Sequence, residues 1–255
     1  MRSQLEGLYW RELLRLYRNP WVLLFTLVQP FMWLAFFGSS FGNAPAGFVQ
    51  SFFGSGSYIA FLLPGVLSTS MLSVGMFGSM STIQDKRFGF MKRILLTPTS
   101  KATVFLSKAL GSTTRGLVQV PVMITAAYAF GVRIPFDPLG WLGWVAALFL
   151  LAIGFSSLFL TVTASSTDWQ TPGVLSNFIT MPLMFASSSL FPQSNFPWWM
   201  QAIARVNSIS ISASYGRGVV LAGNAAWIDL GNLAAFAGVT LLLGIVVASR
   251  YLKVE

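Results

Sequence analysis

Residues Ile83 to Lys101 read IQDKRFGFMKRILLTPTSK, a compact basic segment that lies between two very apolar regions. On its N-terminal side, the 66 residues from Asn19 to Gln84 contain no charged side chain. On its C-terminal side, an apolar run resumes after Arg115. Dense cationic segments between membrane-length apolar runs are typical of cytoplasmic loops. We therefore interpret 83–101 as a cytoplasmic loop of a membrane protein.

The composition supports a membrane protein. Apolar residues make up 55% of the 255 residues and charged residues only 9%, whereas a soluble domain is about a quarter charged. Nine Trp fit aromatic anchoring at the lipid interface. The apolar runs are long and continuous and lack the alternation of a membrane barrel, so we expect an all-α integral membrane fold.

The net charge of +9 has two interpretations, nucleic-acid binding or a positive-inside membrane protein. The bases lie beside apolar runs rather than on a soluble face, which favours the membrane interpretation, with no nucleic-acid partner. Cys and His are absent. Disulfides are therefore excluded, and the commonest general base and metal ligand are missing.

Six apolar runs are long enough to cross about 30 Å of hydrocarbon as helices that rise about 1.5 Å per residue. They cover about 21–41, 58–83, 116–132, 139–164, 171–191 and 230–249, and the helix of the third run is expected to start near Ser100 as a cytosolic extension. If both termini are cytoplasmic, 13 of the 16 Lys and Arg lie inside and only Arg133, Arg205 and Arg217 lie outside. The positive-inside rule therefore predicts a multi-pass protein with both termini in the cytoplasm and an even number of spans.

Residues 1–20 are predicted to form an interfacial helix. They lack the apolar core and cleavage site of a signal peptide. At about 100° per residue, one side carries apolar groups and the other carries bases. The apolar side holds Leu5, Tyr9, Leu13, Leu16 and Tyr17, the basic side holds Arg11, Arg15 and Arg18, and Glu6 is an exception within the apolar side. The alternative is a charged flank that only sets the topology.

The basic segment itself predicts a short helix over Asp85 to Leu96, stopped before Thr97-Pro98, with Ser100 as N-cap of the next helix. Phe88, Phe90 and Met91 are bulky apolar residues among bases, a pattern typical of a docking surface. The alternative is an interfacial helix whose aromatics enter lipid while its bases meet anionic headgroups.

The segment 190–227 is expected on the outer side. Its Pro and aromatic residues predict short helices, with Asn195 as a cap, Pro197 in a first turn, and Ser208 to Leu221 partly re-entering the membrane. An ordinary structured outer loop is the alternative.

The chain offers no catalytic chemistry of its own. GxxxxGK[ST] is absent, so ATP is not bound by a phosphate loop. We find no Ser/His/Asp set and no metal-ligand cluster, and predict no catalytic residue, no metal site and no cofactor in this chain. No Asp or Glu lies in the middle of a predicted span, which weighs against an ion-coupled carrier.

Four segments, in order, resemble the permease of an ABC transporter of the type-2 exporter family, near the daunorubicin-resistance and nodulation-factor export branch. They are RNPWVLLFTLVQPFMWLAFFGSSFG (18–42), YIAFLLPGVL (58–67), DKRFGFMKRILLTPTSKATVFLSKAL (85–110) and LFPQSNFPWWMQAIARVNSIS (190–210). The resemblance implies one transmembrane domain over 1–255, a homodimer in the cell membrane, and separate ATP-binding subunits that bring ATP and Mg. It also implies an ATP-driven exporter of an amphipathic substrate: a drug, a lipid or a lipid-linked glycan.

The resemblance also assigns roles to residues. It makes 1–20 the elbow helix, 84–99 the loop that receives the ATPase stroke, and 190–227 the cap of the exit. The expected coupling residues are Asp85, Lys86, Arg87, Phe88, Gly89, Phe90, Met91, Lys92 and Arg93. The expected substrate path, on the first, second and fifth spans, includes Gln29, Met32, Phe36, Met71, Met76 and Met184, and the expected outer gate comprises Phe191, Phe196, Trp198 and Trp199. An ion-coupled carrier or channel and a non-transporting membrane scaffold are the alternatives.

Overall fold

The computed structural model describes residues 2–42, 44–54, 56–166, 170–222 and 225–251. Within these ranges the regular secondary structure is helical and contains no strand, which confirms the all-α class. The helices are α1 (Arg2–Arg18), α2 (Pro20–Gly42), α3 (Ala46–Phe53), α4 (Tyr58–Arg87), α5 (Phe90–Leu95), α6 (Lys101–Ala129), α7 (Pro138–Ser165), α8 (Thr171–Phe185), α9 (Trp198–Val206), α10 (Ser208–Arg217) and α11 (Trp227–Tyr251).

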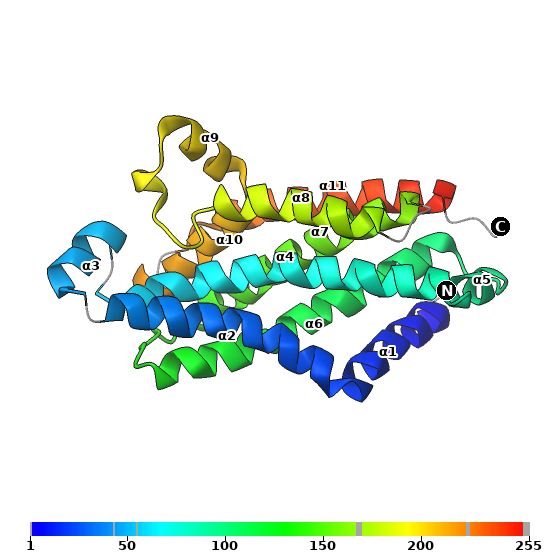
Figure 1. Ribbon diagram of the computed structural model, residues 1–255, viewed down its shortest axis with the longest axis horizontal. Coiled ribbons are helices and arrows are strands. Elements are labelled where there is room, and N and C mark those ends of the chain that lie inside the picture. The colour runs from blue at the N-terminus through cyan, green and yellow to red at the C-terminus, as the bar shows by residue number, and fades with distance from the viewer. Residues whose placement is uncertain (1, 43, 55, 167–169, 223–224, 252–255) are drawn as a thin grey trace.

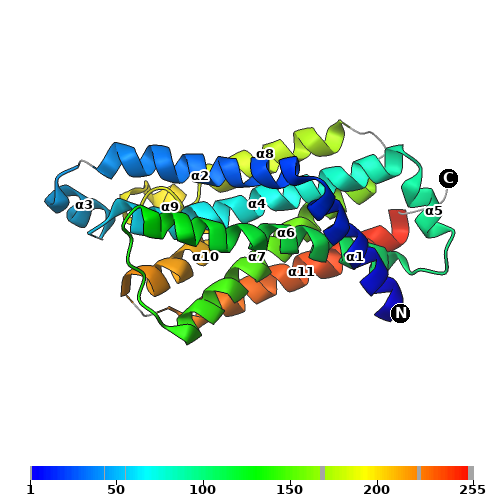
Figure 2. The same ribbon diagram turned by 90° about the horizontal axis from the view of Figure 1, so that it is seen from below.

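The long helices α2, α4, α6, α7, α8 and α11 run side by side along the long axis of the molecule (Figures 1 and 2). Helices α1 and α5 lie at one end, together with both ends of the chain. Helices α3 and α9 lie at the opposite end. We call these the α5 end and the α9 end. The arrangement places the basic segment far from the predicted outer segment.

Three helical stretches are long and apolar enough to cross a membrane, among the residues that the structure describes: Gly47–Arg87, Pro138–Ser165 and Trp227–Arg250. Each of the six predicted spans corresponds to one long helix, but α8 has only 15 residues. The fifth span was predicted to reach Phe191, and this boundary is wrong because a Ser-rich turn ends the helix at Phe185. A multi-pass protein follows, while the count of six crossings stays a prediction.

Helices α4 and α7 form the centre of the core. Leu63, Leu67 and Met71 of α4 and Trp144 and Leu148 of α7 are fully buried. A helix that is apolar on all sides is typically surrounded by other helices or lipid. At Gly75 the two backbones approach so closely that an added Cβ would lie 2.8 Å from the carbonyl carbon of Phe155. Small residues permit such close helix packing in membranes.

The helix ends at the basic segment follow local chemistry. Ser100 caps α6 by accepting a 3.1 Å hydrogen bond from the Thr103 N–H, as predicted. The short helix is α5, which covers 90–95 rather than the predicted 85–96. Helix α4 continues through Arg87, and Gly89 then adopts a left-handed φ of 70° that separates α4 from α5. Glycine tolerates this conformation without the steric penalty of a Cβ.

The segment between α8 and α11 also differs in detail from the prediction. A 3-10 turn covers Gln193–Asn195, and α9 starts at Trp198 with Pro197 as its cap, so Asn195 is not the cap. Asn207 instead caps α10 through a 3.0 Å hydrogen bond from the Ile209 N–H to its side-chain oxygen. Two short helices, α9 and α10, are therefore present in this region.

Candidate functional site

A buried cluster of charged side chains joins three helices at the α5 end. Its members are Arg11, Glu12 and Arg15 of α1, Asp85 of α4 and Lys108 of α6. The Lys108 Nζ atom lies 2.6 Å from Asp85 Oδ2 and 3.4 Å from Glu12 Oε1. Arg11 Nη2 lies 3.1 Å, and Arg15 Nη1 3.4 Å, from the other Asp85 oxygen. Asp85 is therefore the common partner of three cations.

The cluster is largely shielded from solvent. The side chains of Lys108, Asp85 and Glu12 are 4%, 7% and 8% exposed, while Arg11 and Arg15 form the half-exposed rim. Buried charges are tolerated when they are paired and hydrogen-bonded, and removing one partner typically costs about 3–5 kcal/mol. The packing also depends on Gly111, where an added Cβ would lie 2.7 Å from the Cβ of Glu12. Helix α1 is thus held tightly against α6.

The cluster reaches α5 through Arg11. The guanidinium carbon of Arg11 lies 3.7 Å from the centre of the Phe90 ring, a cation–π geometry. Met91 and Ile94 of α5 are buried against Val104 of α6. Helix α5 is therefore fixed to α1, α4 and α6 by an apolar contact and a charged one.

The predicted coupling residues divide into two groups. Phe88 is 77% exposed, and Arg87, Lys92 and Arg93 are exposed beside it. Phe90 and Met91 instead face the helices beneath, and Asp85 lies in the charged cluster. Leu96, which is 75% exposed, adds a second apolar group to the outward side. The exposed side chains of residues 87–96 thus include two large apolar groups and three bases.

Lys86 contacts the end of a different helix. Its Nζ atom donates to the carbonyls of Thr163, Ala164 and Ser166 at 2.8, 3.1 and 3.2 Å. These carbonyls belong to the C-terminal turn of α7, where a cation satisfies free acceptors and complements the helix dipole. Lys101 likewise donates to the Ser249 carbonyl of α11 at 3.0 Å. Two bases of the basic segment therefore bind helix ends.

The predicted interfacial helix, α1, packs on α6 with part of its expected apolar side, but two of its bases also turn inward. Leu16 is buried, and the Tyr9 hydroxyl lies 2.8 Å from Thr114 Oγ1, as expected for the apolar side. Leu5 and Leu13 are half-buried, whereas Tyr17 and Arg18 are exposed. The expectation that all three bases face away from the apolar side is corrected: Arg11 and Arg15 turn inward to Asp85.

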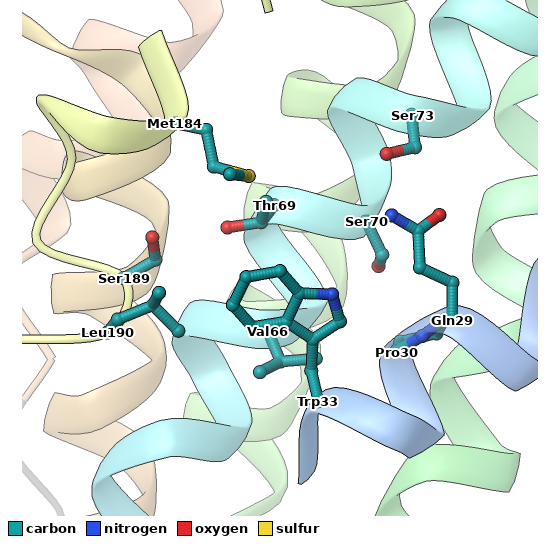
Figure 3. Close-up of a pocket in the computed structure, with 10 residues that line it drawn as sticks. All are labelled: Gln29, Pro30, Trp33, Val66, Thr69, Ser70, Ser73, Met184, Ser189 and Leu190. Atoms are coloured by element: carbon teal, nitrogen blue, oxygen red, sulfur yellow. The ribbon is translucent and has the colours of Figure 1, made fainter. Parts of the chain in front are cut away.

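A small cavity lies between α2, α4 and the end of α8 (Figure 3). Its volume is about 30 Å³, which accommodates one or two waters and no larger molecule. The lining mixes apolar, hydroxyl and amide groups: Gln29, Pro30, Trp33, Val66, Thr69, Ser70, Ser73, Met184, Ser189 and Leu190. The space between these helices is therefore small in this conformation.

Two of the six residues predicted for the substrate path, Gln29 and Met184, line this cavity. Met71 is fully buried in the core, Met76 is half-buried, and Met32 and Phe36 are exposed on α2. The four residues predicted for the outer gate lie at the α9 end and are not among the lining residues. Phe191 and Phe196 flank the 3-10 turn, and Trp198 and Trp199 begin α9 with exposed side chains.

The charged cluster was not predicted from the sequence, where Lys108 and Glu12 were given no role. A signal was present: Glu12 and Asp85 are two of only seven acids in the chain, and Lys108 lies in a largely uncharged helical segment. Long-range pairing between α1, α4 and α6 was needed to bring them together.

The all-helical fold and the long apolar helices define a multi-pass membrane protein. The chain belongs to the ABC-2 type transporter family, whose family model matches residues 3–220. It is therefore an ABC transporter permease, the membrane subunit in a family whose ATP-binding partners are separate subunits.

Several relatives carry related descriptions. The putative transport permease ycf38 of Porphyra purpurea is 28% identical over 209 residues, covering 82% of this chain and 70% of the relative. The daunorubicin resistance ABC transporter permease protein DrrB1 of Streptomyces coeruleorubidus is 23% identical, covering 92% and 83%. Nodulation protein J of Rhizobium meliloti (strain 1021) is 23% identical, covering 77% and 75%.

Proposed function

We propose that this chain is the permease subunit of an ATP-driven exporter that moves an amphipathic substrate across the cell membrane. The observation that carries the proposal is the construction of the α5 end. Phe88 and Leu96 project outward among bases, while α5 itself is fixed from beneath by Arg11, Met91 and Ile94. An exposed apolar group within a basic rim fits a protein partner, and rigid attachment lets that partner move the bundle.

The ATP-binding subunits would dock on this surface and bring ATP and Mg. A displacement of α5 would pass through Phe90 to Arg11, and through Arg11 to Asp85. Asp85 contacts cations on α1 and α6, so these helices and α4 would respond together. The exposed bases and Phe88 would contact the partner, whereas Asp85 and Lys86 would transmit its motion.

The substrate path would lie between α2, α4 and α8, where the small cavity is found. Its mixture of Trp33, Met184 and hydroxyl groups suits a molecule with both apolar and polar parts. The description of DrrB1 names daunorubicin resistance, and that of nodulation protein J names nodulation. A drug, a lipid and a lipid-linked glycan all satisfy the amphipathic requirement.

The orientation and assembly complete the proposal. The α5 end carries most Lys and Arg and would face the cytoplasm, with α1 at the membrane interface and both termini inside. A second copy would pack on the apolar outer surface of α8, where Val174, Phe178 and Met181 are each at least 63% exposed. In this arrangement the two α2–α8 sides would enclose a shared path.

The experiment is co-purification in mild detergent followed by ATP hydrolysis measurements. We expect the wild-type chain to capture an ATP-binding subunit whose hydrolysis is stimulated by an amphipathic drug. The double variant Phe88→Ala/Leu96→Ala should lose that capture, while Phe136→Ala/Leu139→Ala, two exposed apolar residues before and in the first turn of α7, should retain it.

Equal capture by both double variants would overturn the docking assignment. Transport that follows an ion gradient without ATP would instead support a carrier, and function that persists without any ATP-binding subunit would support a scaffold.

A further inference from the structure

A second, larger cavity lies at the α9 end and is not used by the proposed docking or by the small cavity. Its volume is about 330 Å³. It is lined by residues from α4, α9, α10, α11 and the segment after α8, including Arg205, Arg217, Asp229, Gln193, Ser210 and Ser214. Two arginines and one aspartate therefore line the cavity, and its other lining residues are uncharged.

Arg217 is held by backbone oxygens rather than by an acid. Its Nε donates to the Phe61 carbonyl at 3.1 Å, and its Nη2 donates to the Ser188 carbonyl and, at 3.0 Å, to that of Ser189. Its guanidinium carbon also lies 3.7 Å from the centre of the Phe61 ring. Among the described residues, no carboxylate oxygen lies within the 4.0 Å of an ion pair with Arg217. Its positive charge is oriented but not neutralised.

The turn that Arg217 holds separates the two cavities. Ser188 lines the outer cavity, while its neighbour Ser189 lines the small cavity between α2, α4 and α8. The turn is pressed against α4 at Gly65, where an added Cβ would overlap the Ser189 carbonyl. The Ser188 N–H also donates to Ser210 Oγ of α10 at 2.9 Å. The same residues thus close the small cavity and shape the larger one.

We propose that the outer cavity binds the acidic headgroup, a phosphate or a carboxylate, of an amphipathic molecule, with Arg217 and Arg205 as its cationic partners. The proposal rests on the proposed export function, because it places the site directly beyond the closed path. Phe61, Pro192 and Ile211 supply apolar walls for the adjoining chain, and Ser214 and Gln193 supply hydrogen-bonding groups. A planar guanidinium is suited to an oxyanion.

Binding of a headgroup in the outer cavity would weaken the contacts that hold the turn at Ser188 and Ser189. An oxyanion that accepts hydrogen bonds from Arg217 competes with the Ser188 and Ser189 carbonyls for the same N–H groups. The turn would then lose part of its attachment to α10, on the side of the small cavity where passage is blocked. The site would therefore both recognise the headgroup and loosen the barrier behind it.

Native mass spectrometry of the purified full chain in detergent tests the proposal without an ATP-binding subunit. The probe is dihexanoyl phosphatidic acid, with zwitterionic dihexanoyl phosphatidylcholine for comparison. We expect Arg217→Gln to weaken phosphatidic acid binding about tenfold and Arg205→Gln, on the exposed rim, by up to about fivefold. Arg133→Gln, an exposed outer-side base that does not line the cavity, should bind as wild type.

Equal loss in Arg133→Gln and Arg205→Gln would overturn the proposal, since binding would then follow diffuse charge. Unchanged binding in both Arg205→Gln and Arg217→Gln would also overturn it. Arg205→Gln keeps the test valid if Arg217→Gln does not fold, because Arg205 is exposed. Inorganic phosphate at equal concentration should not displace the probe, and complete displacement would overturn the amphipathic part. Headgroup binding and ATP-driven export are measured separately, so either can fail alone.

Discussion

Lys108 Nζ lies 2.6 Å from Asp85 Oδ2, and the two side chains are buried where α4, α6 and α1 meet. The residues are 23 positions apart in the chain, and most of the basic segment lies between them. Their contact joins α4, which precedes α5, to α6, which follows it. The orientation of α5 therefore depends on a charged contact that α5 itself does not contain.

The first prediction concerns this pair. Asp85→Asn leaves Lys108, Arg11 and Arg15 without their shared carboxylate, and we expect the free energy of unfolding to fall by about 3 kcal/mol. Lys108→Met alone should be destabilising as well, since Asp85 is then left with only the rim cations. Chemical unfolding in detergent checks both values.

The double variant Asp85→Asn/Lys108→Met provides the control. Removing both buried partners should cost less than the sum of the two single changes, because neither charge is then left unpaired. Strict additivity would show that the pair contributes no interaction energy.

The second prediction concerns the close contact between α4 and the turn after α8. Gly65→Ala would drive a methyl group into the Ser189 carbonyl, so the turn or the helix must shift. We expect a loss of about 1–3 kcal/mol in unfolding free energy. Gly238→Ala in α11, where nothing lies within 4 Å, is the matched control.

The control variant should match or exceed wild-type stability, because Ala has the higher helix propensity. A similar loss in both variants would contradict a specific role for the Gly65 contact. Thermal unfolding monitored by circular dichroism is sufficient for the comparison.

The third prediction concerns the cation at the end of α7. Lys86→Gln removes the ammonium group that donates to three carbonyls at Thr163, Ala164 and Ser166. We expect the last turn of α7 to open more readily, by about 0.5–2 kcal/mol. Amide hydrogen exchange of peptides that cover the C-terminal part of α7 measures this change. Lys92→Gln, an exposed base of α5, should leave the exchange of that turn unaltered.

The fourth prediction concerns the joint between α4 and α5. Gly89 has a φ of 70°, which an alanine adopts only at a cost of about 1–2 kcal/mol. Gly89→Ala should therefore change how α5 is presented, and lower the coupling between substrate and ATP hydrolysis more than it lowers global stability. Gly231→Ala in α11 serves as the control, because a Cβ added at Gly231 would have no neighbouring atom within 4 Å. Coupling that is reduced equally in both variants would contradict the assigned role of the joint.

Composition and hydropathy predicted the parts of the fold that depend only on whether a segment is apolar or polar. The helical class, the positions of the long helices and the Ser100 cap follow from residues close in sequence. The extent of α5 was overestimated because Gly89 was treated as part of a helix, although it marks a break. The premature end of α8 was missed because Ser187 to Ser189 look compatible with an apolar run.

The candidate site was less accessible to sequence reasoning. The basic segment was located, but the inward direction of Phe90 and Met91 depends on the surface that α1 and α6 provide. Likewise, Arg11 and Arg15 were assigned to the basic side of an interfacial helix, because helical periodicity does not reveal that Asp85 is nearby. Pairing across 70 or more residues requires the tertiary structure.

The backbone approach of α4 and α7 at Gly75 has a mechanical consequence. Two helices that touch without intervening side chains cannot be separated by a modest rotamer change, so we expect α4 and α7 to move together as one rigid pair. If the space at Gln29 and Met184 widens, we expect α2 and α8 to move away from the α4–α7 pair. In a two-fold assembly, α2 and α8 of the two copies would meet at the symmetry axis, and the α4–α7 pairs would remain at the periphery.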